Sequence, residues 1–236
     1  MKSLADDPAE IGRATRSLVA EALAQLNYDP PGPGFLGRIE TFATALALWG
    51  SKLNLTSAPD DPGEIAFHII DSLSPLILAR GAEGIALAGA FDAGVRVLDL
   101  GSGAGFPALI LAAACDTDFT LLEARRKRAS FLAVTAAEMG LAHVRVDSSR
   151  TDSIALEPVF DVATARAFAE PAIVYRTAAA TLKTGGRAII YASPSQRSAI
   201  EEAGADNFEP PGFIPYEIAR GATSVAHLIA VSKRRR

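Results

Sequence analysis

The sequence has a single cysteine, Cys115, among its 236 residues. One cysteine excludes a disulfide framework and a cysteine-rich metal site, so we expect Cys115 to be a small buried hydrophobe. Long apolar runs are also missing, because none reaches the length needed to cross a membrane, and the first residues lack the pattern of a secretory signal. We therefore expect a cytoplasmic protein without membrane contacts.

An excess of basic residues is missing too, since 23 Lys and Arg stand against 27 Asp and Glu, for a net charge of −4. That balance argues mildly against a nucleic-acid partner. The distribution of charge argues the other way, because basic residues form two clusters. The RNA-binding candidates in them are Arg125, Arg126, Lys127, Arg128 and Arg234. A solvated helix face and a solubilising tail are the alternative interpretation of these clusters.

The first third of the chain predicts helices, and the rest predicts alternating strands and helices. Apolar residues recur at helical spacing up to about residue 28, over 35–49 and over 64–80. We assign residues 1–80 to an N-terminal helical cap, the Gly/Ala-rich residues 81–94 to a connector and residues 95–236 to a cofactor-binding domain of alternating strands and helices.

The strand pattern predicts an α/β fold with a doubly wound, mostly parallel, seven-stranded sheet. Strands are expected near residues 95–100, 119–122, 143–146, 160–164 and 187–191, followed by a closing antiparallel pair at 213–218 and 225–231. A turn over residues 183–186 is expected to precede the fifth strand.

A glycine-rich turn follows the first predicted strand and opens a helix. Asp99 ends the strand, and Gly101, Gly103 and Gly105 follow in the pattern G-x-G-x-G. The dinucleotide pattern G-x-G-x-x-G has its third glycine one residue later, and a carboxylate at Asp99 would repel a pyrophosphate. The turn therefore favours S-adenosylmethionine over NAD, and a turn that binds nothing is the remaining alternative.

Glu123 closes the second predicted strand, at about the spacing where a carboxylate meets the ribose of a cofactor. Both cofactor types carry a ribose, so Glu123 does not separate them. His143 and His227 are isolated in the sequence, and no metal site is expected.

Several motifs together resemble a known family. They are Asn54-Leu55-Thr56, His68 with Asp71-Ser72-Leu73, the segment Leu98–Pro107, and Arg166-Ala167-Phe168. In this set the chain resembles class I S-adenosylmethionine-dependent methyltransferases. More narrowly, it is similar to the glucose-inhibited division protein B family, RsmG, which methylates N7 of a guanine in 16S ribosomal RNA.

The resemblance implies a cofactor, a substrate and a set of contacts. S-adenosylmethionine would contact Gly101, Phe106, Thr151, Asp152 and Arg166, with Glu123 on the ribose and Asp152 near the adenine amino group. The implied partner is 16S rRNA or the small ribosomal subunit, and we expect a monomer.

Guanine N7 carries an in-plane lone pair and no proton near neutral pH, so methyl transfer to it needs alignment rather than a general base. We therefore expect no catalytic acid or base, and we take Arg166, Asn54 and His68 as positioning candidates. Phe168 is a candidate for stacking on a flipped base. Alternatively, His68 and Asp71 hydrogen-bond the Asn54 loop and attach the cap to the sheet.

The chain departs from the family pattern at three positions. Phe67 stands where an arginine is usual, Ala192 lies in place of a lysine after the fifth strand, and Ala226 replaces an arginine before His227. These losses favour two alternatives to the 16S rRNA substrate. One is a diverged methyltransferase of another substrate, and the other is a non-catalytic relative that binds the cofactor or the ribosome.

Overall fold

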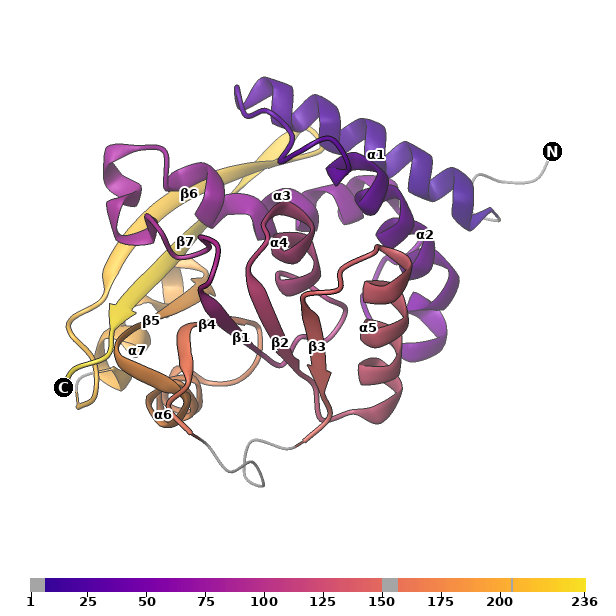
Figure 1. Cartoon of the computed structure of the whole chain (residues 1–236). Helices are drawn as coiled ribbons and strands as arrows, with labels where there is room; N and C mark the ends of the chain where they lie inside the picture. The colour runs from indigo at the N-terminus through magenta and orange to yellow at the C-terminus, as the bar shows by residue number, and fades with distance from the viewer. Residues whose placement is uncertain (1–6, 150–156, 205) are drawn as a thin grey trace.

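The computed structural model describes residues 7–149, 157–204 and 206–236. A seven-stranded sheet runs through it in the order β3-β2-β1-β4-β5-β7-β6 (Figure 1). The strands are β1 Arg96–Leu100, β2 Asp118–Leu122, β3 Val144–Asp147, β4 Phe160–Arg166, β5 Leu182–Ala192, β6 Gly212–Arg220 and β7 Thr223–Lys233. Strands β1 to β5 pair in parallel, and β7 pairs antiparallel with both β5 and β6. The predicted fold class and the closing antiparallel pair are confirmed.

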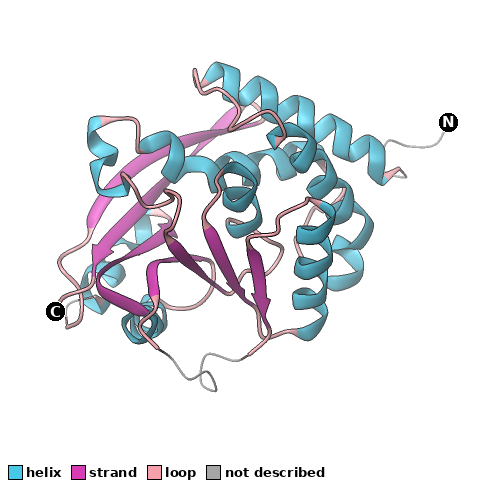
Figure 2. Cartoon of the chain, viewed as in Figure 1, coloured by secondary structure: helices cyan, strands magenta, loops and turns pink. Residues whose placement is uncertain are grey.

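Helices cover both faces of the sheet (Figure 2). The first three helices are α1 Pro8–Gln25, α2 Phe35–Leu53 and α3 Pro62–Leu78, and those between and after the strands are α4 Ala108–Ala114, α5 Arg126–Glu138, α6 Pro171–Thr181 and α7 Arg197–Ala203. Helix α1 packs on α2 and α3, and these two contact α4. The division into cap, connector and methyltransferase domain stays a prediction.

Alternation along the strands produces two hydrophobic cores, one on each face of the sheet. Val97 and Ile189 belong to the core shared with α1 to α5, whereas their neighbours Leu98 and Ile190 belong to the core under α6 and α7. Successive side chains of a strand point to opposite faces, and both faces here are buried. This explains why the strands read as almost continuous apolar runs.

The first and third helices begin where a capping carboxylate precedes a proline. Asp7 accepts a hydrogen bond from the Ala9 N–H at 3.0 Å, and Asp61 accepts from the Gly63 N–H at 2.8 Å. Pro8 and Pro62 then take the first helical position, where no N–H is needed. Acidic residue plus proline thus fixes both starting points.

The structure differs from the sequence-based expectation in three places. The connector contains a 3₁₀ helix, Ala82–Leu87, and the Arg187 guanidinium donates to the carbonyls of Ala86 and Ala88 behind it. The expected turn at 183–186 lies inside β5, with Gly185 at a φ of +79°. Cys115 is half-buried rather than buried.

Within the described ranges, no helix has the length and apolar character needed to span a bilayer.

Candidate active site

The order in which strands are added to the sheet reverses between β1 and β4. After β1 the chain adds β2 and β3 on one side, and it then returns to place β4 on the other side of β1. A crevice opens at the carboxyl ends of the strands at such a point, and ligands of open α/β sheets bind there. The glycine turn lies in this position, directly after β1.

Three glycines of the turn have left-handed backbone conformations, with φ of +71° at Gly101, +54° at Gly103 and +98° at Gly105. The N–H groups of Gly101 and Ser102 both donate to the carbonyl of Leu122 at the end of β2. A Cβ built on Gly103 would meet no atom nearer than the Gly101 carbonyl oxygen, at 3.7 Å. The backbone at Gly103 is therefore open to a ligand.

Glu123 is fixed at the rim of the glycine turn. Its Oε2 accepts from the Gly103 N–H at 3.0 Å, and its Oε1 accepts from the Arg125 N–H at 2.8 Å. The side chain is buried. Each carboxylate oxygen keeps a second lone pair, so Glu123 can accept further hydrogen bonds from ribose hydroxyls. Its geometry fits the predicted ribose contact.

Asp99 is fully buried between β1 and β4. Its Oδ1 accepts from the Thr164 hydroxyl at 2.6 Å, and burial raises the pKa of the carboxyl to about 6. Among the described residues its Oδ2 has no hydrogen-bond partner. A buried oxygen without a partner is costly, and a donor from a bound ligand would remove that cost.

Phe106 joins the turn to the N-terminal helices. Its ring centroid lies 5.1 Å from that of Phe42 on α2 and 5.3 Å from that of His68 on α3. The Arg166 guanidinium carbon lies 5.6 Å from the same ring. Phe106 is therefore the point where the helical part of the chain and the end of β4 reach the predicted cofactor site.

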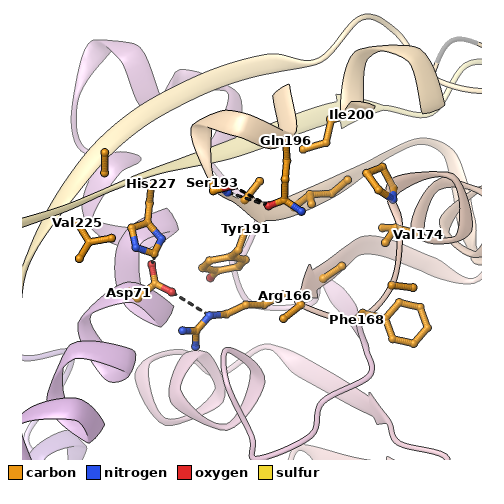
Figure 3. Close-up of a pocket in the computed structure, with 17 residues that line it drawn as sticks. Asp71, Arg166, Phe168, Val174, Tyr191, Ser193, Gln196, Ile200, Val225 and His227 are labelled. Atoms are coloured by element: carbon orange, nitrogen blue, oxygen red, sulfur yellow. Dashed lines mark hydrogen bonds and ion pairs between the residues drawn. The ribbon is translucent and has the colours of Figure 1, made fainter. Parts of the chain in front are cut away.

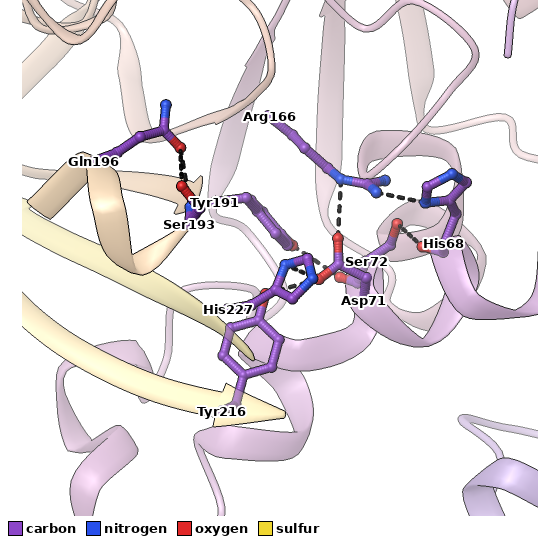
Figure 4. Close-up of polar contacts among 9 residues, drawn as sticks. All are labelled: His68, Asp71, Ser72, Arg166, Tyr191, Ser193, Gln196, Tyr216 and His227. Atoms are coloured by element: carbon purple, nitrogen blue, oxygen red, sulfur yellow. Dashed lines mark hydrogen bonds and ion pairs between the residues drawn. The ribbon is translucent and has the colours of Figure 1, made fainter. Parts of the chain in front are cut away.

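Arg166 ends β4 and is held by two residues of α3 (Figure 4). Its Nε lies 2.9 Å from Oδ2 of Asp71, and its Nη2 donates to Nδ1 of His68 at 2.7 Å. Burial, and next the Arg166 charge, lower the pKa of His68 to about 4, so the imidazole is neutral with its proton on Nε2. Of the alternative expectation, the attachment of the N-terminal helices to the sheet is therefore confirmed, but the partner is Arg166 on β4 and not the Asn54 loop.

The same carboxylate collects two further partners from the closing strands. Tyr216 on β6 donates its hydroxyl to Oδ1 of Asp71 at 2.8 Å, and Nδ1 of His227 on β7 lies 3.4 Å from that oxygen. His227 is isolated in the sequence, but in the fold it lies beside Asp71. The described part of the chain contains no group of three or more His, Cys, Asp or Glu that could hold a metal ion.

Asn54 is the C-cap of α2, with φ and ψ of 51° and 53°. Its carbonyl oxygen accepts from the Arg128 guanidinium at the start of α5. Asn54 therefore joins the end of α2 to the start of α5.

A cavity of about 300 Å³ lies beside Arg166 and reaches α3, whose Asp71 also lines it (Figure 3). Residues from α3, β4, α6, β5, the 3₁₀ helix Pro194–Gln196, α7 and β7 line it, including Arg166, Phe168, Tyr191, Gln196 and His227. The Phe168 ring lies against both this cavity and the turn, because it lines the cavity and a Cβ on Gly101 would lie 2.2 Å from it. Ser193 donates its N–H to Oε1 of Gln196 at 2.9 Å, which leaves the amide nitrogen as the donor end of that side chain.

The basic candidates divide between two places. Arg125, Arg126 and Lys127 are exposed at the start of α5, directly after Glu123, and Arg128 is half-buried against Asn54. Arg234 instead donates to the Leu182 carbonyl at the beginning of β5, on the opposite edge of the sheet. The structure does not bring Arg234 to the site. Thr151 and Asp152 lie outside the described residues.

The three departures from the family pattern have different surroundings. Phe67 is buried, with its ring 5.1 Å from the Arg220 guanidinium carbon, so a cation from β6 lies beside it. Ala192 is buried in β5, whereas Ala226 is exposed and lines the cavity.

A mostly parallel seven-stranded sheet with this strand order, a glycine turn at the switch point and an acidic residue closing β2 defines the class I methyltransferase fold. A SAM-dependent O-methyltransferase from Thermotoga maritima has the same fold, with a TM-score of 0.51 and 18% identity over 64% of each chain.

The chain belongs to the family described as rRNA small subunit methyltransferase G, whose model matches residues 36–210. It is 38% identical over 151 residues to the ribosomal RNA small subunit methyltransferase G of Neisseria gonorrhoeae, covering 63% of this chain and 66% of that protein. It is 30% identical over 171 residues to the protein of that name from Streptococcus pyogenes, covering 70% and 68%. The resemblance seen in the motifs is confirmed at the level of the family, and the alignment with the first relative spans just under two thirds of its length.

Proposed function

We propose that the chain is an S-adenosylmethionine-dependent methyltransferase of N7 of a guanine in small-subunit (16S) ribosomal RNA. The observation that carries this proposal is the placement of two sites on either side of Phe168. One is the glycine turn with its fixed Glu123, and the other is the cavity lined by Arg166. Family membership supports the substrate, because both relatives carry the name ribosomal RNA small subunit methyltransferase G.

The turn has the groups that the cofactor needs. Glu123 would accept from the ribose hydroxyls, the open backbone at Gly103 would allow close approach, and Asp99 and Phe106 would lie beneath and beside the bound molecule. Thr151 and Asp152 would also contact the cofactor, with Asp152 near the adenine amino group. When bound, S-adenosylmethionine supplies a methyl group on a sulfonium, which is an electrophile.

The cavity has the groups that a purine needs. Arg166 lines it with N–H donors that Asp71 and His68 do not use, and guanine presents O6 as an acceptor beside N7, whose lone pair stays free to attack the methyl group. The amide nitrogen of Gln196 is a second donor, and Phe168 offers a ring to stack on. These residues orient N7 and exclude water. They do not remove a proton, because N7 has none to lose.

Arg166 cannot act as a base, since a guanidinium stays protonated at any working pH. Its ion pair with Asp71 fixes the direction of the side chain, so we assign it to positioning.

We further propose that the protein acts as a monomer in the cytoplasm. Sedimentation of the purified chain would test the oligomeric state, and sedimentation of a cell extract would test the localisation.

The test is incorporation of a labelled methyl group into 16S RNA taken from cells that lack this gene. We expect one methyl group per RNA, and Arg166→Ala, with folding checked by circular dichroism, should abolish its incorporation. Label found only in protein or small metabolites would refute the RNA substrate. Binding of the donor by calorimetry without any transfer would identify the non-catalytic alternative, and binding of NADH alone would identify an oxidoreductase.

A further inference from the structure

Helices α2 and α5 lie side by side (Figure 1). Their side chains leave an apolar groove between them. Its volume is about 290 Å³. Trp49 and Leu53 line it from α2, and Phe131 and Val134 line it from α5. Trp49 is 44% exposed and Val134 is 54% exposed. A large aromatic ring at the surface beside an apolar groove is a common sign of a binding site.

The groove has basic residues at one end. The Lys52 ammonium lies 4.8 Å from the centroid of the Trp49 ring, and Lys127 lines the groove itself. Arg125 and Arg126 are exposed at the start of the same helix. One acidic residue, Glu138, lines the opposite end. An aromatic surface next to several cations matches a nucleotide, with a base for the ring and phosphates for the charges.

The groove also lies on the same edge of the molecule as the glycine turn. Helix α5 begins directly after Glu123, whose Oε1 accepts from the Arg125 N–H. The C-cap of α2, Asn54, is bonded to Arg128 at that same end of α5. A strand of RNA whose target base occupies the cavity near Arg166 can therefore continue across the basic start of α5.

We propose that the groove between α2 and α5 binds an unpaired base of the RNA substrate that flanks the methylated nucleotide. The Trp49 indole stacks on this base, and Lys52 and Lys127 neutralise the adjoining phosphates. This inference rests on the proposed RNA substrate and adds a second base-binding position to it. RNA is read chiefly at unstacked, single-stranded bases, and aromatic platforms beside basic grooves hold such bases.

Trp49 is the only tryptophan of the chain, so intrinsic fluorescence reports on the groove directly. We would titrate the protein with a short single-stranded oligoribonucleotide, and in parallel with an abasic oligomer of the same length and charge. Stacking on the indole predicts strong quenching by the first and weak quenching by the second. Equal quenching by both would overturn the proposal, because phosphates on Lys52 would then explain the signal.

Methylation kinetics give a second measurement. Trp49→Ala should raise the KM for RNA about tenfold, with kcat and the affinity for S-adenosylmethionine unchanged, and Trp49→Phe should retain most of the affinity because it keeps an aromatic face. The matched control is Leu48→Ala, since Leu48 is the adjacent residue, is 45% exposed and does not line the groove. An unchanged KM in Trp49→Ala would refute a base at this position.

Other outcomes separate this inference from the function on which it rests. If calorimetry finds no donor binding or no RNA is methylated, the proposed function fails, while the two titrations still decide whether a base stacks on Trp49. A concentration-dependent shift of Trp49 emission in the free protein, with dimers in sedimentation, would show that a second copy covers the groove. That result would overturn the RNA proposal.

Discussion

The guanidinium of Arg166, at the end of β4, lies 2.9 Å from the carboxylate of Asp71 on α3. Asp71 is 1% exposed, and it is also the acceptor for Tyr216 on β6. One buried carboxylate thus joins three separate parts of the chain. The direction of the Arg166 side chain, which we propose positions the substrate, is set by a helix that precedes the sheet in the sequence.

Removal of this carboxylate should destabilise the whole fold. In Asp71→Ala, Arg166 would lose its counter-ion in a site where its side chain is only 16% exposed, and Tyr216 would lose its acceptor. Breaking a buried pair in this way costs about 3–5 kcal/mol. Urea unfolding followed by circular dichroism measures the change.

The control is the exposed ion pair between Arg197 and Glu201 on α7. Glu201→Ala should cost about 0.5 kcal/mol or less, because water already solvates both partners. Similar losses in the two variants would contradict the role given to Asp71.

Glu123→Gln should weaken donor binding without unfolding the chain. The amide keeps one oxygen for the Gly103 N–H or the Arg125 N–H, but it loses the charge that strengthens hydrogen bonds from ribose hydroxyls. We expect the affinity for S-adenosylmethionine to fall about tenfold in calorimetry, which matches a loss of about 1.5 kcal/mol. Glu138→Gln, on the far end of α5, serves as the control and should bind as the wild type does.

Gly101→Ala should be costly for two separable reasons. Its φ of +71° is unfavourable for alanine, and the new Cβ would lie 2.2 Å from the Phe168 ring. Gly94→Ala isolates the first reason, because Gly94 has a φ of +86° and no atom within 4 Å of an added Cβ. We expect a loss of about 1–2 kcal/mol at Gly94.

The loss at Gly101 should exceed that at Gly94 by about 1–3 kcal/mol, because the ring must move. In a double-mutant cycle with Phe168→Ala, this excess should disappear. Equal losses at the two glycines in thermal unfolding would mean that Phe168 does not press on the turn.

Because the fold lowers the pKa of His68, we expect the protein to lose stability in mild acid. The pKa of His68 is about 4 in the fold against 6.5 in the unfolded chain, because burial and Arg166 disfavour the charged ring. The unfolded chain therefore binds the proton first, and the contribution of His68 to stability, complete above pH 6.5, is lost as the pH falls toward 4. Between about pH 8 and about pH 5 this amounts to about 2 kcal/mol.

Asp99 titrates in the same range with the opposite sign. Its pKa rises from 3.8 to about 6 in the fold, so its contribution is present at low pH and is lost as the pH rises through that interval. The wild-type profile alone would mix the two groups. Both the wild type and His68→Gln contain Asp99, so its contribution cancels in the difference between their unfolding free energies. This difference should shrink by about 2 kcal/mol from about pH 8 to about pH 5. A constant difference would show that His68 is not the group involved.

Sequence patterns were sufficient for the parts of the site that lie close together in the chain. The glycine turn and Glu123 follow consecutive strands, and parallel strands bring their carboxyl ends to one edge, so Gly103 and Glu123 had to meet. The pattern of strands did not reveal the early start of β5, which begins at Leu182 and contains the expected turn.

The Asp71 contacts could not be predicted in this way. Whether His68 and Asp71 face the Asn54 loop or Arg166 depends on the angle at which α3 packs on the sheet, and side-chain packing decides that angle. His227 and Tyr216 meet Asp71 only because β7 inserts between β5 and β6, a strand order that local periodicity does not encode.

The closing hairpin has a consequence for the order of folding during translation. Arg220 at the end of β6 donates to both carboxylate oxygens of Glu64, and Tyr216 on β6 donates to Asp71. These two acidic residues of α3 are therefore without these partners until β6 has been synthesised. Until then, a nascent chain lacks the Tyr216 hydrogen bond to Asp71 and the Arg220 ion pair with Glu64, both of which hold α3 on the sheet. Stalled or prematurely terminated chains should therefore be favoured targets of proteases and chaperones.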